Sequence, residues 1–162
     1  MENQKILLQK AIRLLAARPH STAEIKDKLR QKNIGTDDDI IAVIERLNKL
    51  HYLDDQDFAR IFINSSLRKK PQGLRMIKIK LSQKGITEEV FSAALKASIT
   101  ENQFSEEQMA IEASQKKLRT LHKLPYQKQI EKLYRFLLSR GFSQDAIHKA
   151  ITFTKRHLDS KI

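Results

Sequence analysis

The chain has 162 residues, a net charge of +12 and no cysteine. Its length allows one ordinary domain or a short array of small modules, and the missing cysteine excludes disulfides, thiolate zinc sites and a cysteine nucleophile. Proline (3 residues) and glycine (4 residues) are scarce, while charged residues make up 31% of the chain. This composition favours helices joined by short connections and predicts an all-α protein.

Apolar residues recur at three- and four-residue spacing at the start of the chain, which predicts three helices there. Ser21 to Glu24 form a capping-box pattern, in which the serine hydroxyl and the glutamate carboxylate each satisfy a backbone N–H group. Asp37–Asp39 place negative charge at the start of the third helix, where the helix dipole favours it. These helices are predicted near residues 4–17, 22–32 and 37–50.

Six further helices follow the same pattern. Gly85 and Gly141 come directly after two of them, where a left-handed C-terminal cap favours glycine. Ser105-Glu106-Glu107-Gln108 is a second capping-box pattern. The six helices are predicted near residues 55–69, 73–84, 88–98, 106–120, 126–140 and 144–157.

The nine predicted helices form three copies of one unit of about 50 residues, a period typical of helical arrays. Ile25 and Leu29 align with Ile77 and Leu81, and these align in turn with Leu133 and Leu137. The same alignment places Lys32-Asn33-Ile34, Lys84-Gly85-Ile86 and Arg140-Gly141-Phe142 over one another. We therefore predict an all-α fold of three tandem three-helix repeats, at residues 1–53, 54–100 and 101–158, which form an elongated array whose curvature is left open.

Basic residues gather in two stretches that contain no acidic residue, 58–87 and 113–130. Lysine and arginine near phosphates release condensed counterions, so such stretches favour an anionic partner. A solvated helix face is the alternative explanation. The predicted partner- or nucleic-acid-binding residues are Arg68, Lys69, Lys70, Arg75, Lys78, Lys84, Lys116, Lys117 and Arg119.

Met76 and Ile79 form a second candidate partner contact. They project from the side of their predicted helix opposite its main apolar stripe, and charged residues replace both in the aligned helices of the other two repeats. A partner protein would explain these exposed apolar positions. Packing against a neighbouring repeat would also explain them, since the units of an array must bury surface between one another.

The sequence offers little catalytic chemistry. His51 lies near Asp54, Asp55 and Asp57, but helix N-terminal capping explains these carboxylates better than a metal site does. The other histidines are scattered, and neither a phosphate-binding loop nor a dinucleotide-binding glycine pattern is present. We expect no enzyme, no cofactor and no metal.

The apolar runs are too short to cross a bilayer, and the first residues lack the apolar core of a signal peptide. We expect a cytoplasmic monomer with no membrane partner.

A helix-turn-helix DNA-binding protein or transcriptional regulator is the alternative function. Three-helix units with a basic surface fit this class. However, the third helices offer Ala42, Val43, Ser92 and Ala93, whereas base edges are usually read by Arg, Asn or Gln. Sequence-specific operator recognition is therefore the runner-up.

Several motifs in a fixed order resemble the RecX family of recombinase regulators. The central ones are Tyr52-Leu53-Asp54-Asp55, Phe58-Ala59-Arg60, Lys70-Pro71-Gln72-Gly73-Leu74-Arg75 and Leu81-Ser82-Gln83-Lys84-Gly85-Ile86. Ala11 to Leu15 and Ser21 to Leu29 resemble the first unit of the family, and Tyr134 to Phe142 resemble its last. The resemblance covers about residues 6–152. Lys80 and Ser66 depart from the pattern, in which an acidic residue and arginine are commoner.

The resemblance implies three tandem three-helix repeats and a bacterial protein that binds RecA. Such a protein regulates, and mainly inhibits, RecA by lying along the RecA–DNA filament. It thereby limits recombinase, ATPase and co-protease activities in DNA repair, DNA recombination and the SOS response. Direct DNA binding is expected to be weak and independent of sequence.

Overall fold

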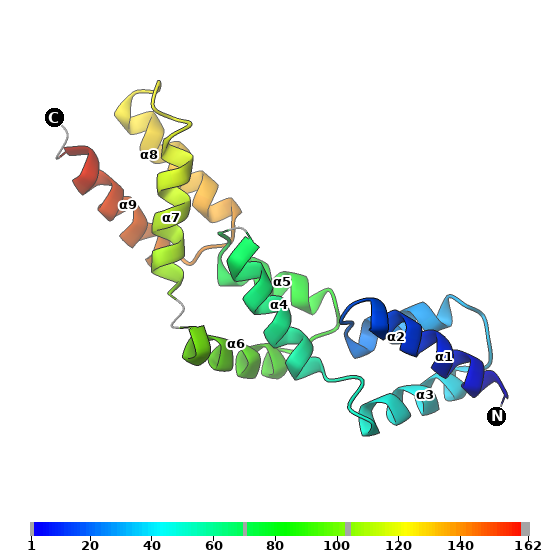
Figure 1. The fold of residues 1–162 in the computed structure, drawn as a ribbon. Coiled ribbons are helices and arrows are strands. Elements are labelled where there is room, and N and C mark those ends of the chain that lie inside the picture. Colours follow the sequence, from blue (N-terminus) through cyan, green and yellow to red (C-terminus); the bar gives the residue numbers. More distant parts are fainter. Residues whose placement is uncertain (1, 70, 103–104, 160–162) are drawn as a thin grey trace. The chain divides into compact units, whose positions relative to one another are not determined.

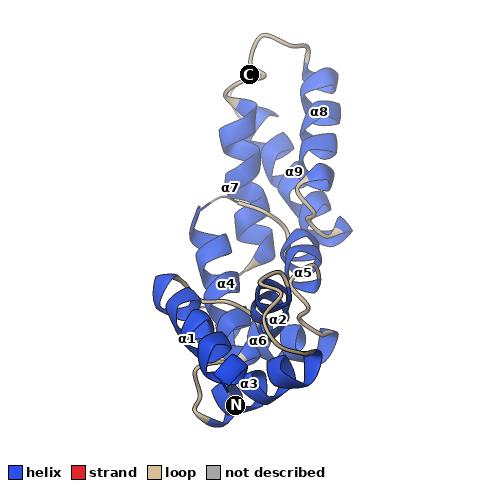
Figure 2. Cartoon of the chain, turned by 90° about the vertical axis from the view of Figure 1, so that its right-hand side faces the viewer, coloured by secondary structure: helices blue, strands red, loops and turns tan. Residues whose placement is uncertain are grey.

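A computed structural model describes residues 2–69, 71–102 and 105–159, and these residues form helices and loops without a strand (Figures 1 and 2). No helix among them is long and apolar enough to span a membrane. The helices are α1 (Glu2–Ala17), α2 (Thr22–Arg30), α3 (Asp37–Lys49), α4 (Asp55–Lys69), α5 (Leu74–Ser82), α6 (Glu88–Asn102), α7 (Glu106–Leu118), α8 (Tyr126–Ser139) and α9 (Gln144–Asp159).

Local cap chemistry sets most helix starts where the sequence predicted them. Ser21 forms the predicted capping box with Glu24, and Thr36 forms another with Asp39. Ser105 accepts a hydrogen bond from the backbone N–H of Gln108. The largest difference is at α6, which continues to Asn102 instead of ending near residue 98, since its last residues include neither proline nor glycine.

The chain divides into two compact units, which are described separately. Unit 1 consists of the residues up to Phe62 together with Leu81–Leu95. Unit 2 consists of Ile63–Lys80 together with the residues from Lys96 onward. The division passes through α4, α5 and α6, so the middle repeat contributes residues to both units.

Each unit has an apolar core built mainly by one terminal repeat. In unit 1, helices α1–α3 bury a cluster that includes Leu7, Ala11 and Leu47. In unit 2, helices α7–α9 bury a cluster that includes Ala110 and Ile147. The positions that define the repeat are fully buried in all three copies, which confirms the alignment; they are Ile25, Leu29, Ile77, Leu81, Leu133 and Leu137.

A left-handed residue follows the middle helix of every repeat. Gly85 and Gly141 have φ values of 76° and 78°, which confirms the predicted caps. The aligned residue of the first repeat, Asn33, also has a positive φ of 52°. Asparagine tolerates this conformation better than most side chains.

Candidate functional site

Within unit 1, the N-terminus of α2 docks on the C-terminal cap of α5, and we call this contact the first joint. The Ser21 hydroxyl accepts a hydrogen bond from the Glu24 N–H (3.1 Å) and donates one to the Lys84 carbonyl oxygen (2.6 Å). A Cβ atom on Gly85 would overlap the Ala23 methyl group. The capping residue of α2 therefore also links the first repeat to the second.

Glu24 is the electrostatic centre of the first joint. Its carboxylate accepts hydrogen bonds from the Lys84 ammonium (2.7 Å), the Ser21 N–H (3.2 Å) and Arg18 (3.3 Å). Burial opposes ionisation of Glu24, but the hydrogen bonds from Lys84, Ser21 and Arg18 outweigh it and lower its pKa to about 2. The Lys84 ammonium also lies 6.0 Å from the ring centroid of Phe62. Lys84 is thus engaged inside the fold.

Within unit 2, the start of α5 docks on the C-terminal cap of α8, and we call this contact the second joint. The Gly73 N–H donates a hydrogen bond to the Arg140 carbonyl oxygen (2.9 Å). A Cβ atom on Gly73 would overlap the Gly141 carbonyl group, and one on Gly141 would lie 2.7 Å from the Met76 backbone nitrogen. The two backbones meet without room for a side chain.

A carboxylate at the start of the next repeat completes each joint. Asp55, the first residue of α4, accepts a hydrogen bond from the Thr22 N–H (2.8 Å). Glu106, the first residue of α7, accepts one from the Leu74 N–H (2.9 Å) and a longer one from the Ser143 N–H (3.4 Å). Thr22 and Leu74 are the first residues of α2 and α5, so both joints follow one plan.

The capping interpretation of the acidic cluster before α4 is confirmed. The Asp54 carboxylate accepts hydrogen bonds from the N–H groups of Gln56 (2.9 Å) and Asp57 (3.0 Å). Among the residues that the structure describes, no group of histidine and acidic side chains is arranged to hold a metal ion.

The predicted basic contact residues do not share one environment. Arg68, Arg75, Lys78, Lys116 and Arg119 are exposed, and all belong to unit 2. Lys117 is half-buried, with its ammonium 5.5 Å from the ring centroid of Phe136. Lys84 differs because it is committed to the first joint.

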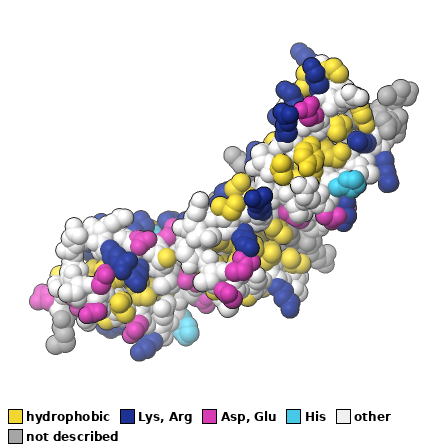
Figure 3. Space-filling model, turned by 180° about the vertical axis from the view of Figure 1, so that it is seen from behind, with side chains coloured by type: hydrophobic (Ala, Val, Ile, Leu, Met, Phe, Trp, Pro, Cys, Tyr) yellow, Lys and Arg dark blue, Asp and Glu magenta, His cyan; other side chains and the backbone are white. Residues whose placement is uncertain are grey.

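Two of the predicted basic contacts are only partly placed. Lys69 ends α4 without a described side chain, and Lys70 lies outside the described residues. On the face shown in Figure 3, lysine and arginine side chains are spread over the surface rather than gathered in one patch.

Met76 and Ile79 lie in different environments in the structure. Met76 is half-buried and lies against Gly141 in the second joint, as the packing interpretation predicts. Ile79 is 42% exposed, so it is available to a partner.

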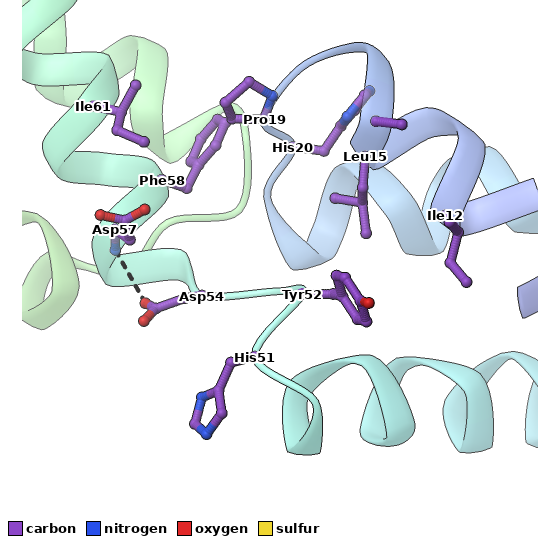
Figure 4. A pocket seen from close by; sticks show the side chains of 11 residues that line it. Ile12, Leu15, Pro19, His20, His51, Tyr52, Asp54, Asp57, Phe58 and Ile61 are labelled. Atoms are coloured by element: carbon purple, nitrogen blue, oxygen red, sulfur yellow. Dashed lines mark hydrogen bonds between the residues drawn. The ribbon is translucent and has the colours of Figure 1, made fainter.

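An apolar groove in unit 1 was not predicted from the sequence. It has a volume of about 380 Å³ and lies between the end of α1, the loop before α4 and the first turns of α4 (Figure 4). Leu15 and Pro19 line it from one side and Phe58 and Ile61 from α4. Tyr52, which belongs to a motif quoted above, also lines it and is 57% exposed. The motif that contains Tyr52 was the sequence feature nearest to this groove.

Comparison with known proteins places this architecture in a family. The chain matches the models of the first, second and third three-helix domains of RecX over residues 8–47, 54–95 and 105–151. It is 37% identical over 145 residues to the regulatory protein RecX of Chlorobaculum tepidum, covering 89% of this chain and 85% of that protein. This chain belongs to the RecX family.

Other members of the RecX family agree in sequence and in fold. The regulatory protein RecX of Prosthecochloris aestuarii is 35% identical over 144 residues, which cover 89% of this chain and 90% of that protein. The crystal structure of RecX from Lactobacillus salivarius has the same fold, with a TM-score of 0.82 at 24% identity over 93% of this chain and 96% of that one. Each RecX domain match falls inside one of the predicted repeats.

Proposed function

We propose that this chain is a non-catalytic regulator, mainly an inhibitor, of RecA that acts by binding the RecA–DNA filament. Membership in a family of regulatory proteins is the observation that carries the proposal. The partner follows from the RecX resemblance. We also propose that the chain is a cytoplasmic monomer that acts in DNA repair and the SOS response.

The contact surface that we propose consists of exposed cations on α4 and α5 and at the end of α7. Its described members are Arg68, Arg75, Lys78, Lys116 and Arg119, with Lys117 beside them in sequence. Lys84 is left out because Glu24 holds its ammonium. An exposed charge pair contributes less than about 1 kcal/mol, so single substitutions should be mild and combined ones severe.

The direct test follows ATP hydrolysis by RecA filaments on single-stranded DNA. A quadruple variant changes Arg68, Arg75, Lys116 and Arg119 to Glu. A control with the same change in charge converts Lys5, Lys49, Lys96 and Lys155, which are also exposed, to Glu. We expect wild type and the control to slow hydrolysis and the quadruple variant to lose this effect while keeping its helical circular dichroism.

Two outcomes would count against the proposal in different ways. If wild type neither bound the filaments nor changed hydrolysis, RecA would be the wrong partner. If the folded quadruple variant remained fully active, RecA could stay as the partner but the proposed surface would be wrong.

Free DNA should bind weakly and without sequence preference. If about five phosphates are neutralised, log affinity should fall against log salt with a slope of roughly −3.5 to −4.5. Titrations at two salt concentrations with scrambled competitors measure this slope. A strong preference for one duplex sequence would instead support the helix-turn-helix alternative.

A further inference from the structure

A second groove in unit 1 lies between α1 and α2 and has a basic lining. Its volume is about 470 Å³. One face of α1 and the end of α2 form its walls, and no acidic residue lines it. The lining residues are Lys10, Arg13, Leu14, Ala17, Arg18, His20, Lys28, Leu29 and Lys32.

Most of the positive charge in this groove has no counter-charge in the fold. Arg18 pairs with Glu24 at 3.3 Å. The other four cations form no ion pair with any residue that the structure describes; they are Lys10, Arg13, Lys28 and Lys32. Like charges held close together repel one another, so the groove is electrostatically suited to an anionic ligand.

The floor of the groove is apolar. Leu14 is half-buried and Ala17 is exposed, so both present apolar surface in the groove, whereas Leu29 also lines it but is fully buried. A nucleic-acid backbone would use the cations but would gain little from this floor. A peptide with carboxylates around an apolar side chain would use both, because the side chain would bury apolar surface while the carboxylates form charge-assisted hydrogen bonds.

We propose that the groove between α1 and α2 binds an acidic peptide segment of a partner protein. An apolar side chain of the segment sits over Leu14 and Ala17, and its carboxylates lie between the α1 cations and those of α2. The groove contains none of the residues proposed above to contact the RecA–DNA filament. The inference therefore goes beyond the proposed function and holds whatever the identity of the partner.

His20 provides an independent readout of occupancy. It is 6% exposed, and its Nδ1 lies 2.9 Å from the Arg18 carbonyl oxygen. Burial lowers the pKa of His20, and the charges of Arg18 and Lys28 act in the same direction, against the hydrogen bond to Arg18 and the charge of Glu24. Carboxylates bound beside Arg18 and Lys28 should raise this pKa, which NMR titration of the imidazole can follow.

The test uses the full-length chain and two fluorescent probes in anisotropy titrations. The first probe is a peptide of glutamates around a Leu-Phe pair, and the second is an oligothymidine strand. The rim variant changes Lys10, Arg13 and Lys28 to Glu, and a charge-matched control changes Lys5, Lys49 and Lys96 to Glu. We expect the rim variant to bind the peptide at least about tenfold more weakly than the control, with similar DNA affinities for both variants.

Other results would overturn the proposal. Equal peptide affinities for rim and control variants, with both folded by circular dichroism, would show that the groove is not the site. If wild type bound the Leu-Phe peptide no more tightly than a peptide in which two serines replace the Leu-Phe pair, the apolar floor would not contribute to peptide binding. If the rim variant lost more affinity for oligothymidine than for the peptide, the groove would be assigned to nucleic-acid binding. None of these results depends on RecA, so the proposed function stands or falls separately.

Discussion

The two joints between repeats have the same plan but different chemistry. In the first joint, the Ser21 hydroxyl donates a hydrogen bond to the Lys84 carbonyl oxygen, just after the end of α5, and the salt bridge between Lys84 and Glu24 lies beside it. In the second joint, the backbone N–H of Gly73 makes the equivalent bond, and no side chain fits between the backbones. The first joint should therefore depend more strongly on charge and pH, through Glu24, whereas the second should be more sensitive to side-chain volume, because Gly73 meets backbone atoms directly.

The largest effect is expected from Gly73→Ala. The added methyl group would overlap the Gly141 carbonyl group, and backbone atoms packed on both sides have little freedom to yield. We expect a loss of more than about 3 kcal/mol in the free energy of unfolding, measured by urea denaturation, or a failure to fold.

The matched control at the aligned position is Ser21→Ala. It removes the hydroxyl without adding volume, so a loss of about 1–2 kcal/mol is expected. If Gly73→Ala cost no more than Ser21→Ala, the close backbone contact in the second joint would not exist as described.

The charge of Glu24 should stabilise the first joint, and this stabilisation should depend on pH. The folded-state pKa of Glu24, about 2, lies below its ordinary value of 4.5. The stabilisation from the ionised carboxylate is therefore complete above about pH 5 and is lost as the pH falls toward 2. A pKa difference of this size corresponds to at most about 3 kcal/mol.

We therefore expect Glu24→Gln to lower stability at pH 7 and to have a smaller effect at pH 3. Urea denaturation at the two pH values measures the difference, and Glu112→Gln at an exposed position serves as the control. An effect of Glu24→Gln that did not shrink with falling pH would contradict the assigned ionisation.

Met76 and Ile79 allow a joint residue and a surface residue to be compared within one helix, α5. Met76→Glu should lower the free energy of unfolding by about 1–2 kcal/mol, because the charge would be placed against the second joint. Ile79→Glu should change it by less than about 0.5 kcal/mol while weakening binding to RecA filaments. Thermal denaturation and filament co-sedimentation measure the two effects. Marked destabilisation by Ile79→Glu would show that this residue packs inside the fold.

Local chemistry was sufficient to predict the helices and several of their caps, and an internal alignment of the sequence predicted the repeats. Ser21 and Gly85 were both identified from neighbouring residues, because caps depend on contacts within a few positions. The joints could not be predicted in this way. The bond from Ser21 to the Lys84 carbonyl spans 63 positions, and neither the repeat alignment nor the acid-free stretch that contains Lys84 indicated this contact.

The left-handed positions show the same limit. Asn33 and Gly85 share a left-handed backbone conformation, and a Cβ atom on Gly85 would overlap Ala23 of the first repeat. The sequence could assign the conformation but not the packing that makes glycine necessary there.

The candidate sites were harder to predict than the fold. Long stretches without acidic residues drew attention to α4, α5 and α7. The cations of the groove between α1 and α2 were missed because Glu24 and Asp27 separate Arg13 from Lys28 along the chain. The helices bring these cations to one groove and leave Asp27 outside its lining. Whether charged side chains gather in the folded protein depends on the helix faces that carry them. Counting charged residues along the sequence does not show this.

The assignment of some residues to the joints and of others to the surface is tested most directly by substituting two cations of the RecX motifs. Lys84 pairs with Glu24, whereas Arg75 is exposed at the start of α5. Urea denaturation of Lys84→Gln and Arg75→Gln gives the free energy of unfolding of each variant. We expect a loss of about 1–2 kcal/mol for Lys84→Gln, because the partly buried Glu24 carboxylate loses its ion-pair partner, and less than about 0.5 kcal/mol for Arg75→Gln. Equal stability of the two variants would contradict the assignment of Lys84 to a joint between repeats.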